Sequence, residues 1–281
     1  MNQSDSVNRL QAIRHVVQIF FLVIAIFGVT GLVGMTGLIY PFYFCYSCPY
    51  AWASCPLGIL QHAFIDMRAL GFLEGLRLLV YLVGVISLFG LAFGRFICGW
   101  ACPIGALQDL LGGLRMKAFS KELPRLYPLR FLKYGILLAI PITSYIFVEV
   151  LYTRFCPVGG ITGTLPTLLL DWSGWVGGTD FPIKIASVSI FFVLVLIVFR
   201  GWCRYLCPLG AMLSPFNKLT PLNIHVNKKA CVNCGLCSKN CPMKIDVPKS
   251  KRSLECIGCG KCVGACKNHS ARLRVFGKEV V

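Results

Sequence analysis

Charged side chains are scarce in this sequence of 281 residues. Only 14% of the residues are charged and 56% are hydrophobic, whereas a soluble globular domain usually carries about 25% charged residues. The polar side chains are too few to cover a water-soluble surface, so the composition excludes a soluble enzyme of two ordinary domains. The same hydrophobic content excludes a disordered chain.

Recognisable catalytic motifs are also missing. The sequence has no evident nucleophile–base pair, no phosphate-binding loop and no glycine-rich dinucleotide motif. We therefore expect no catalytic residues beyond redox centres. Acidic residues are few as well, with 11 Asp and Glu against 28 Lys and Arg, which gives a net charge of +17. In a soluble protein that charge would indicate a nucleic-acid partner. In a membrane protein the first question is on which side of the membrane the positive residues lie.

Long apolar runs predict membrane-spanning helices. A helix needs about 20 apolar residues to cross a hydrocarbon core of about 30 Å. The first run is too long for a secretory signal and no cleavage pattern follows it, so we interpret it as a retained helix. The four predicted spans are Val16–Tyr40, Leu76–Gly94, Leu132–Leu151 and Ile183–Phe199.

The distribution of Lys and Arg predicts the orientation of these spans. With the N-terminus inside the cell, 24 of the 28 basic residues fall in inside segments. Such an asymmetry favours a multi-pass protein of the cytoplasmic membrane with both termini in the cytoplasm. Because topology accounts for the positive charge, we expect no nucleic-acid partner. Contact of the basic C-terminal segment with anionic membrane lipid is a further expectation.

Cysteine is abundant, and eight of the 16 cysteines lie in the last 51 residues. They form two runs of the type Cys-x-x-Cys-x-x-Cys-x-x-x-Cys, the pattern of bacterial ferredoxins with two [4Fe-4S] clusters. In that pattern the fourth cysteine of each run binds the other cluster. Gly235, Gly258 and Gly260 would let the backbone wrap closely around the clusters. A pair of zinc sites is the alternative, although zinc rarely uses such a run of eight. The predicted first set is Cys231, Cys234, Cys237 and Cys266, and the second is Cys256, Cys259, Cys262 and Cys241.

A second repeat, Cys-Pro-x-Gly, begins at Cys55, Cys102, Cys156 and Cys207. The spacings of 47, 54 and 51 residues indicate an internally repeated unit. Pro is favoured at the first position of a helix, so each cysteine would lie at a helix N-terminus, where N–H groups and the helix dipole favour negative charge. A cluster with four thiolates is an anion, and this placement suits it.

The predicted topology sorts the remaining eight cysteines into two sets. The inside set is Cys98, Cys102, Cys203 and Cys207, an inner membrane cluster whose alternative is structural or regulatory thiols. The outside set is Cys45, Cys48, Cys55 and Cys156, an outer membrane cluster. For the outer set the alternative is a disulfide such as Cys45–Cys48 or Cys55–Cys156, since the outside is oxidising in many cells.

The motifs Phe96–Gly105 and Gly201–Gly210, followed by the double ferredoxin run, resemble the NapH/MauN-type membrane-bound 4Fe-4S ferredoxins, which are related to NosR-type and CcoG-type proteins. The resemblance covers nearly the whole chain. It implies an iron–sulfur electron-transfer subunit that works with a quinol or with a partner at the opposite face. The outer set of four cysteines departs from the family pattern.

The predicted fold is an all-α bundle of four transmembrane helices with re-entrant Cys-Pro segments over residues 1–221, followed by an α+β ferredoxin domain with two clusters over residues 222–281. The leading hypothesis is an electron-transfer subunit of an oxidoreductase complex, in which about four clusters carry electrons across the membrane. Redox proteins on one or both faces, such as a multihaem cytochrome or a reductase, would be its partners.

Two alternatives stay open. One is a quinol dehydrogenase subunit that uses only the two ferredoxin clusters and binds a quinone, with His62 or Glu149 exchanging protons. The other is an assembly or sensor protein that reduces a metal. Trp172 and Trp175 are expected to anchor at the level of the lipid headgroups.

Overall fold

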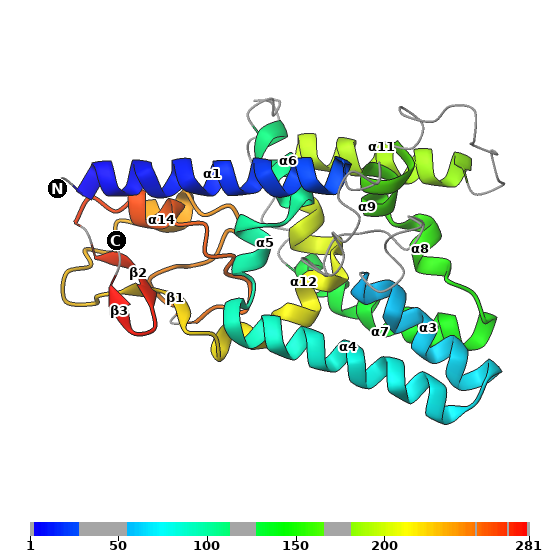
Figure 1. Ribbon diagram of the computed structural model, residues 1–281. Coiled ribbons are helices and arrows are strands. Elements are labelled where there is room, and N and C mark those ends of the chain that lie inside the picture. The colour runs from blue at the N-terminus through cyan, green and yellow to red at the C-terminus, as the bar shows by residue number, and fades with distance from the viewer. Residues whose placement is uncertain are drawn as a thin grey trace.

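The structure is a computed structural model that describes residues 3–27, 55–112, 128–165, 181–250, 252–268 and 270–279. It has two parts along one axis, a helical part and a smaller part that contains the strands (Figure 1). Helix α1 (Gln3–Phe27) runs beside both parts, and both chain ends lie at the end with the strands. The remaining helices of the helical part are α3 (Pro56–Ala69), α4 (Phe72–Phe93), α5 (Phe96–Trp100), α6 (Pro103–Leu111), α7 (Leu132–Phe147), α8 (Leu151–Phe155), α9 (Pro157–Gly159), α11 (Phe181–Ile197) and α12 (Pro208–Leu213).

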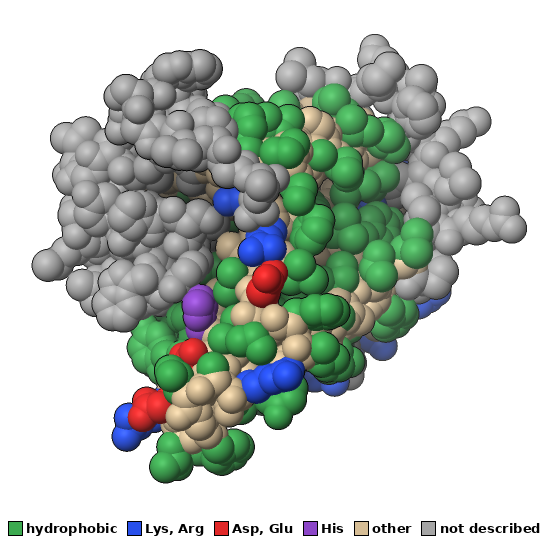
Figure 2. All heavy atoms as spheres, turned by 90° about the vertical axis from the view of Figure 1, so that its right-hand side faces the viewer, with side chains coloured by type: hydrophobic (Ala, Val, Ile, Leu, Met, Phe, Trp, Pro, Cys, Tyr) green, Lys and Arg blue, Asp and Glu red, His purple; other side chains and the backbone are tan. Residues whose placement is uncertain are grey.

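Three of the described helices are long and apolar enough to cross a membrane. These segments are Val7–Ala25, Phe72–Phe93 and Leu129–Phe147. Helix α11, which covers most of the fourth predicted span, is apolar but shorter. Their outward faces carry exposed aliphatic side chains such as Val80, Leu138 and Ile190, as expected for contact with lipid tails. Viewed from the end opposite the strands, the described surface is mainly hydrophobic with scattered charges (Figure 2).

The first predicted span differs from the structure. The sequence placed it at Val16–Tyr40, whereas α1 begins at Gln3 and residues 28–54 lie outside the described part. The reason is that the polar start of α1 has a protein partner. Val7 and Leu10 pack where Gly264 and Gly260 of the ferredoxin part leave room for them. The start of α1 is therefore stabilised by tertiary contacts with the ferredoxin part.

Short irregular helices join the long ones. A Cys-Pro pair starts α3, α6, α9 and α12, because the missing N–H of Pro costs nothing at the first helical position. The thiol of Cys55 accepts from Gly58 N at 3.4 Å, and that of Cys102 from Gly105 N at 3.2 Å. The connecting turns are the 3-10 helices η5 (Pro128–Phe131) and η8 (Pro215–Lys218) and the π-helical turns η6 (Gly160–Thr164) and η7 (Trp202–Leu206).

The C-terminal part is an α+β unit, as predicted. Strand β1 (Leu222–Val226) pairs antiparallel with β2 (Ala271–Val275), so that Ile224 lies opposite Leu273. Strand β3 (Lys278–Glu279) pairs with β2. Between β1 and β2 lie two short helices, α13 (Leu236–Lys239) and α14 (Lys261–Gly264), each preceded by a glycine with φ of 73°. The two halves of this part therefore share the same local backbone conformation, a left-handed glycine followed by a short helix.

One hydrophobic core runs through both parts. It includes Leu82 and Phe191 of the long helices together with Met243, Ile257 and Cys259 of the C-terminal part. Ile257 and Phe191 are almost fully buried. The two parts are therefore packed together as one unit, and Cys98, Cys102, Cys241 and Cys259 lie in their common core.

Candidate functional site

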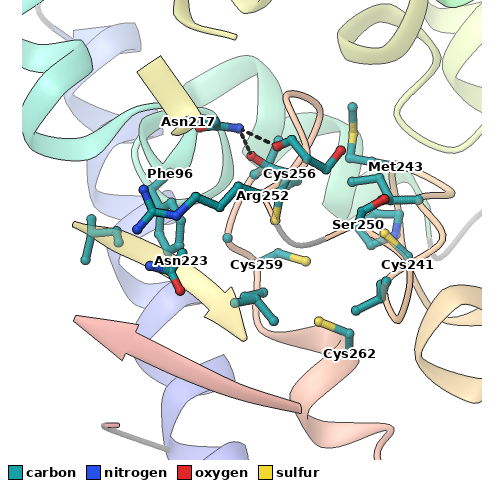
Figure 3. A pocket seen from close by; sticks show the side chains of 18 residues that line it. Phe96, Asn217, Asn223, Cys241, Met243, Ser250, Arg252, Cys256, Cys259 and Cys262 are labelled. Carbon is teal, nitrogen blue, oxygen red and sulfur yellow. Dashed lines mark hydrogen bonds between the residues drawn. The ribbon is translucent and has the colours of Figure 1, made fainter. Parts of the chain in front are cut away.

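The second predicted ferredoxin set surrounds one cavity. Cys241, Cys256, Cys259 and Cys262 all line it, and their sulfur atoms face a common space (Figure 3). Cys241, Cys259 and Cys262 are buried, and Cys256 is half-buried. Burial raises the pKa of the Cys256 thiol to about 12. Binding to iron would remove that proton, since thiolate is the ligating form.

Backbone geometry positions this cavity. Gly258 and Gly260 have φ of 60° and 73°, a region that glycine tolerates best. A side chain at Gly258 would also meet the ring of Phe96, which lies against the loop. Asn217 holds the loop by donating to Ser253 O, Leu254 O and Cys256 O at 3.2, 3.2 and 2.8 Å. These contacts fix the cysteine loop against the helical part.

The first predicted set is more open. Cys237 is buried and Cys266 lies within electrostatic range of it. Cys266 is paired with the Ser270 hydroxyl at 3.1 Å. Cys231 lines a separate, solvent-open cavity, and Cys234 is exposed. Cys231 and Cys234 are therefore more accessible to solvent than Cys237.

The predicted inner set also meets at one cavity. Cys98, Cys102, Cys203 and Cys207 line it together with Arg95 and Trp202. Gln108 donates to the Cys203 sulfur at 3.0 Å, in addition to the Gly105 N–H on Cys102. Hydrogen bonds to sulfur favour the thiolate that binds iron.

The outer set is described only in part. Cys55 and Cys156 line one cavity with Tyr152 and Trp202, and they are not joined to each other by a disulfide. Cys45, Cys48, Trp172 and Trp175 lie outside the described residues. The structure therefore brings together the two cysteines of this set that it describes.

The inner cavity and the cavity of Cys55 and Cys156 are neighbours, which the sequence did not predict. Their cavities share the lining residues Val158, Trp202 and Cys207. The sequence placed the sets on opposite faces because it treated Cys55 as lying beyond a completed span. In the structure α3 extends for 14 residues, about 21 Å, before α4 packs back against it. Cys55, at the N-terminal end of α3, therefore lies well inside the helical part.

The fit of these cavities to clusters follows from the ligand chemistry. Among the described residues, no three His, Cys, Asp or Glu side chains approach closely enough to bind one metal ion. A [4Fe-4S] cluster instead has each of its four irons bound to a different thiolate, so its ligands stand around a space. Four cysteines around one cavity, with N–H groups directed at their sulfurs, fit a cluster better than a single zinc ion.

Helix α5 links the inner set to the ferredoxin part. It carries Cys98 and packs directly on the loop that carries Cys256 and Cys259. Trp100 donates from Nε1 to Gly258 O at 3.0 Å. A Cβ on Gly99 would lie 2.1 Å from Ile257 O, so only glycine permits this approach. The contact places the inner cavity next to the second ferredoxin cavity.

Two buried ion-pair networks, which no sequence motif predicted, lie beside these cavities. In the first, Arg200 donates two bonds to Asp109, at 2.8 and 2.6 Å, and Arg14 also pairs with Asp109. All three side chains are nearly fully buried. The signal was present, because charged residues inside apolar surroundings are usually paired and functional, but their partners are distant in the sequence.

In the second network, Glu255 pairs with Arg95 at 2.7 Å and with Lys133. Tyr134 donates to the other oxygen of Glu255 at 3.3 Å. Burial alone would raise the pKa of Glu255, but the two cations lower it to about 2. For Asp109, burial is likewise outweighed by Arg200 and Arg14, which hold its pKa well below the usual range. Both carboxyls are therefore ionised at neutral pH.

We expect Asp109→Asn to destabilise the protein by about 3–5 kcal/mol, because it leaves two buried arginines without a counter-charge. Thermal unfolding in detergent measures the change. The matched control is Glu74→Gln, which breaks an exposed pair with Arg77 and should cost less than about 1 kcal/mol. Equal effects of the two substitutions would contradict the assigned role of the buried network.

The residues considered for proton exchange are placed as follows. Glu149 forms an ion pair with Arg154 at 2.8 Å, and about half of its side chain is exposed. His62 lies half-buried on α3. Neither residue lines a described cavity that contains cysteines.

Two protein-family models match the chain, one in the helical part and one in the ferredoxin part. A 4Fe-4S binding domain matches twice, at residues 74–122 and 179–228, and a 4Fe-4S dicluster domain matches residues 216–277. The double match supports a twofold repeat that contains the Cys-Pro-x-Gly motifs at Cys102 and Cys207, whereas the motifs at Cys55 and Cys156 lie outside the matched segments. No solved structure matches the chain.

Three relatives show how far the likeness extends. YccM of Escherichia coli is 34% identical over 61% of this chain and 48% of its own length. The uncharacterized protein MJ0750 of Methanocaldococcus jannaschii is 33% identical over 76% of this chain and 83% of its own length. The ferredoxin-type protein NapH of Haemophilus influenzae is 29% identical over 65% of this chain and 63% of its own length.

Apolar helices, cysteine-lined cavities and these matches support one description. The protein is a membrane protein of ferredoxin type that binds 4Fe-4S clusters and transfers electrons with redox partners. From the resemblance of its motifs and the extent of these matches, the chain belongs to the NapH/MauN-type family of 4Fe-4S ferredoxin-type proteins.

Proposed function

We propose that the protein carries electrons across the membrane through four [4Fe-4S] sites, each held by the four cysteines assigned above. The observation that carries this proposal is the continuity of the cavities. The ferredoxin cavity adjoins α5, α5 carries Cys98 of the inner cavity, and Cys207 lines both the inner cavity and the cavity of Cys55 and Cys156. A [4Fe-4S] cluster bound at each site would accept and release single electrons.

The residues between the sites support this order. Phe96 lines the ferredoxin cavity from the membrane side, and Trp202 stands between the two membrane cavities. Both are packed into the buried interior, which excludes water and fixes the spacing of neighbouring sites. Polar backbone at this depth is tolerated where protein surrounds it, as the short helices η6 and η7 are surrounded here. In the proposed orientation the ferredoxin part faces the cytoplasm.

Metal counting tests the number of sites. Purified protein should contain about sixteen irons and sixteen sulfides per chain, because each of four clusters holds four of each. About eight irons would contradict the membrane sites and leave the two ferredoxin clusters. The count is made on anaerobically purified full-length protein, with the protein concentration determined by amino-acid analysis.

Reconstitution into vesicles tests whether electrons cross the membrane through the protein. With the ferredoxin part outside, external dithionite should reduce ferricyanide that is trapped inside the vesicles. Protein-free vesicles measure the leak. If the iron sites are reduced while the trapped ferricyanide stays oxidised, the proposal of transmembrane transfer is wrong.

Quinol oxidation is a second candidate function, favoured by a groove of about 560 Å³ beside the second ferredoxin loop. Phe131 and Tyr134 of the membrane side and Glu255 of the loop line it. The Tyr134 hydroxyl donates to Glu255, which adjoins Cys256 in the chain, so a quinol in this groove would lie beside an electron acceptor. In vesicles that contain no ferricyanide, reduction of the ferredoxin clusters by a lipid-soluble quinol would favour this function.

A further inference from the structure

The two halves of the membrane part carry equivalent arginines. Arg95 precedes Cys98 by three positions, and Arg200 precedes Cys203 by three positions. Each arginine reaches across to the other half. A Cβ on Gly210 would lie 3.2 Å from Arg95 Nη2, and a Cβ on Gly105 would lie 3.5 Å from Arg200 Nη2. Both arginines are almost completely buried, so each needs a negative partner.

The two halves provide that partner differently. Asp109 lies seven positions after Cys102 and neutralises Arg200. The position seven after Cys207 is Ser214, which has no charge and receives only a bond of 3.4 Å from Arg95. The second half therefore lacks the carboxylate that the first half has.

The ferredoxin part fills this gap. Arg95 Nη1 donates to Glu255 Oε2 at 2.7 Å and to Leu254 O at 3.0 Å. Glu255 is adjacent to Cys256 in the chain, and Lys133 of α7 pairs with the same carboxylate. Asn217 also binds the backbone on both sides of Glu255.

We propose that Glu255 is a docking residue, which supplies the carboxylate missing from the second repeat and thereby fixes the Cys256–Cys262 loop on the membrane part. Arg95 and Lys133 of the membrane part are the cations that bind the Glu255 carboxylate. The docking does not depend on the proposed function, whereas its effect on electron transfer rests on that function. By the same geometry, Glu255 acts as a positioning residue for the second ferredoxin site.

Hydrogen exchange of the full-length protein in detergent tests this docking. In Glu255→Gln the amides of residues 254–259 should exchange about tenfold faster or more, because a buried ion pair is lost. The double variant Ser214→Asp/Glu255→Gln gives Arg95 a carboxylate within its own half. It should regain the thermal stability of the membrane part, while the loop continues to exchange quickly.

Two outcomes would overturn the proposal. One is unchanged exchange of the loop in Glu255→Gln, and the other is restored loop protection in the double variant, which would mean that Glu255 only neutralises Arg95. If the single variant does not fold, the double variant alone carries the test. Glu279→Gln, which alters a surface carboxylate paired with Arg272 and Arg274, is the matched control. An iron content of only eight per chain would contradict the proposed function and leave this result intact.

Discussion

Cys207→Ser is expected to remove about four irons per chain and to abolish electron transfer across the membrane. Cys207 is the one cysteine among the described residues that lines both membrane cavities. Its loss should open the inner site and also alter the wall of the site at Cys55 and Cys156. Iron analysis and the trapped-ferricyanide assay measure the two effects.

Two neighbouring cysteines serve as comparisons for Cys207. Cys102→Ser should also cost about four irons, but it leaves the cavity of Cys55 and Cys156 unchanged, since Cys102 lines only the inner one. Cys156→Ser should remove the outer cluster and leave the inner cluster in place. Unchanged iron in Cys156→Ser, with Cys45 and Cys48 oxidised, would support a disulfide in place of the outer cluster. Unchanged iron in Cys207→Ser would refute the assignment of the inner site.

The second large effect is expected from Gly99→Ala. The added methyl group would lie 2.1 Å from Ile257 O, which is a backbone atom and cannot move aside by a side-chain rotation. Helix α5 and the ferredoxin loop must then separate, and overpacking of this kind costs about 1–3 kcal/mol. Because transfer between redox sites falls steeply with distance, we expect slow reduction of the trapped acceptor with an unchanged iron count.

The control for Gly99→Ala is Gly84→Ala. Gly84 lies in α4, and a Cβ there would have nothing within 4 Å. Ala is favoured over Gly in a helix, so this variant should be as stable as the unmodified protein or more so. If Gly99→Ala transferred electrons at the rate of Gly84→Ala, the close contact between α5 and the loop would have no part in transfer.

The sequence predicts the local features of this protein well, for physical reasons. Cysteine spacing within a loop fixes which sulfurs can face one cavity, and the four predicted cysteines around the second ferredoxin cavity do so. Likewise, Pro after Cys predicts a helix start at each of the four motifs, because the constraint acts within one turn.

Long-range features were not predictable in the same way. Arg95 and Glu255 are separated by 160 positions, and no local pattern relates them. The depth of Cys55 depends on how far α3 extends before α4 returns, which hydropathy averaged over a window does not report. The predicted span began too late in the chain because a hydropathy scale counts polar residues such as Gln11 against a membrane helix. In the structure Gln11 has a hydrogen-bond partner in the ferredoxin part.

The position of α1 has a consequence for how the chain matures. Gln11 donates to Cys259 O, and these residues are 248 positions apart. Contacts between such distant segments form late, since the intervening chain must first be ordered. Helix α1 therefore gains this contact only after the loop that carries Cys259, 248 positions later, has been synthesised. A chain truncated before Cys259 would leave the face of α1 that carries Val7, Leu10 and Gln11 without these packing partners and exposed to solvent.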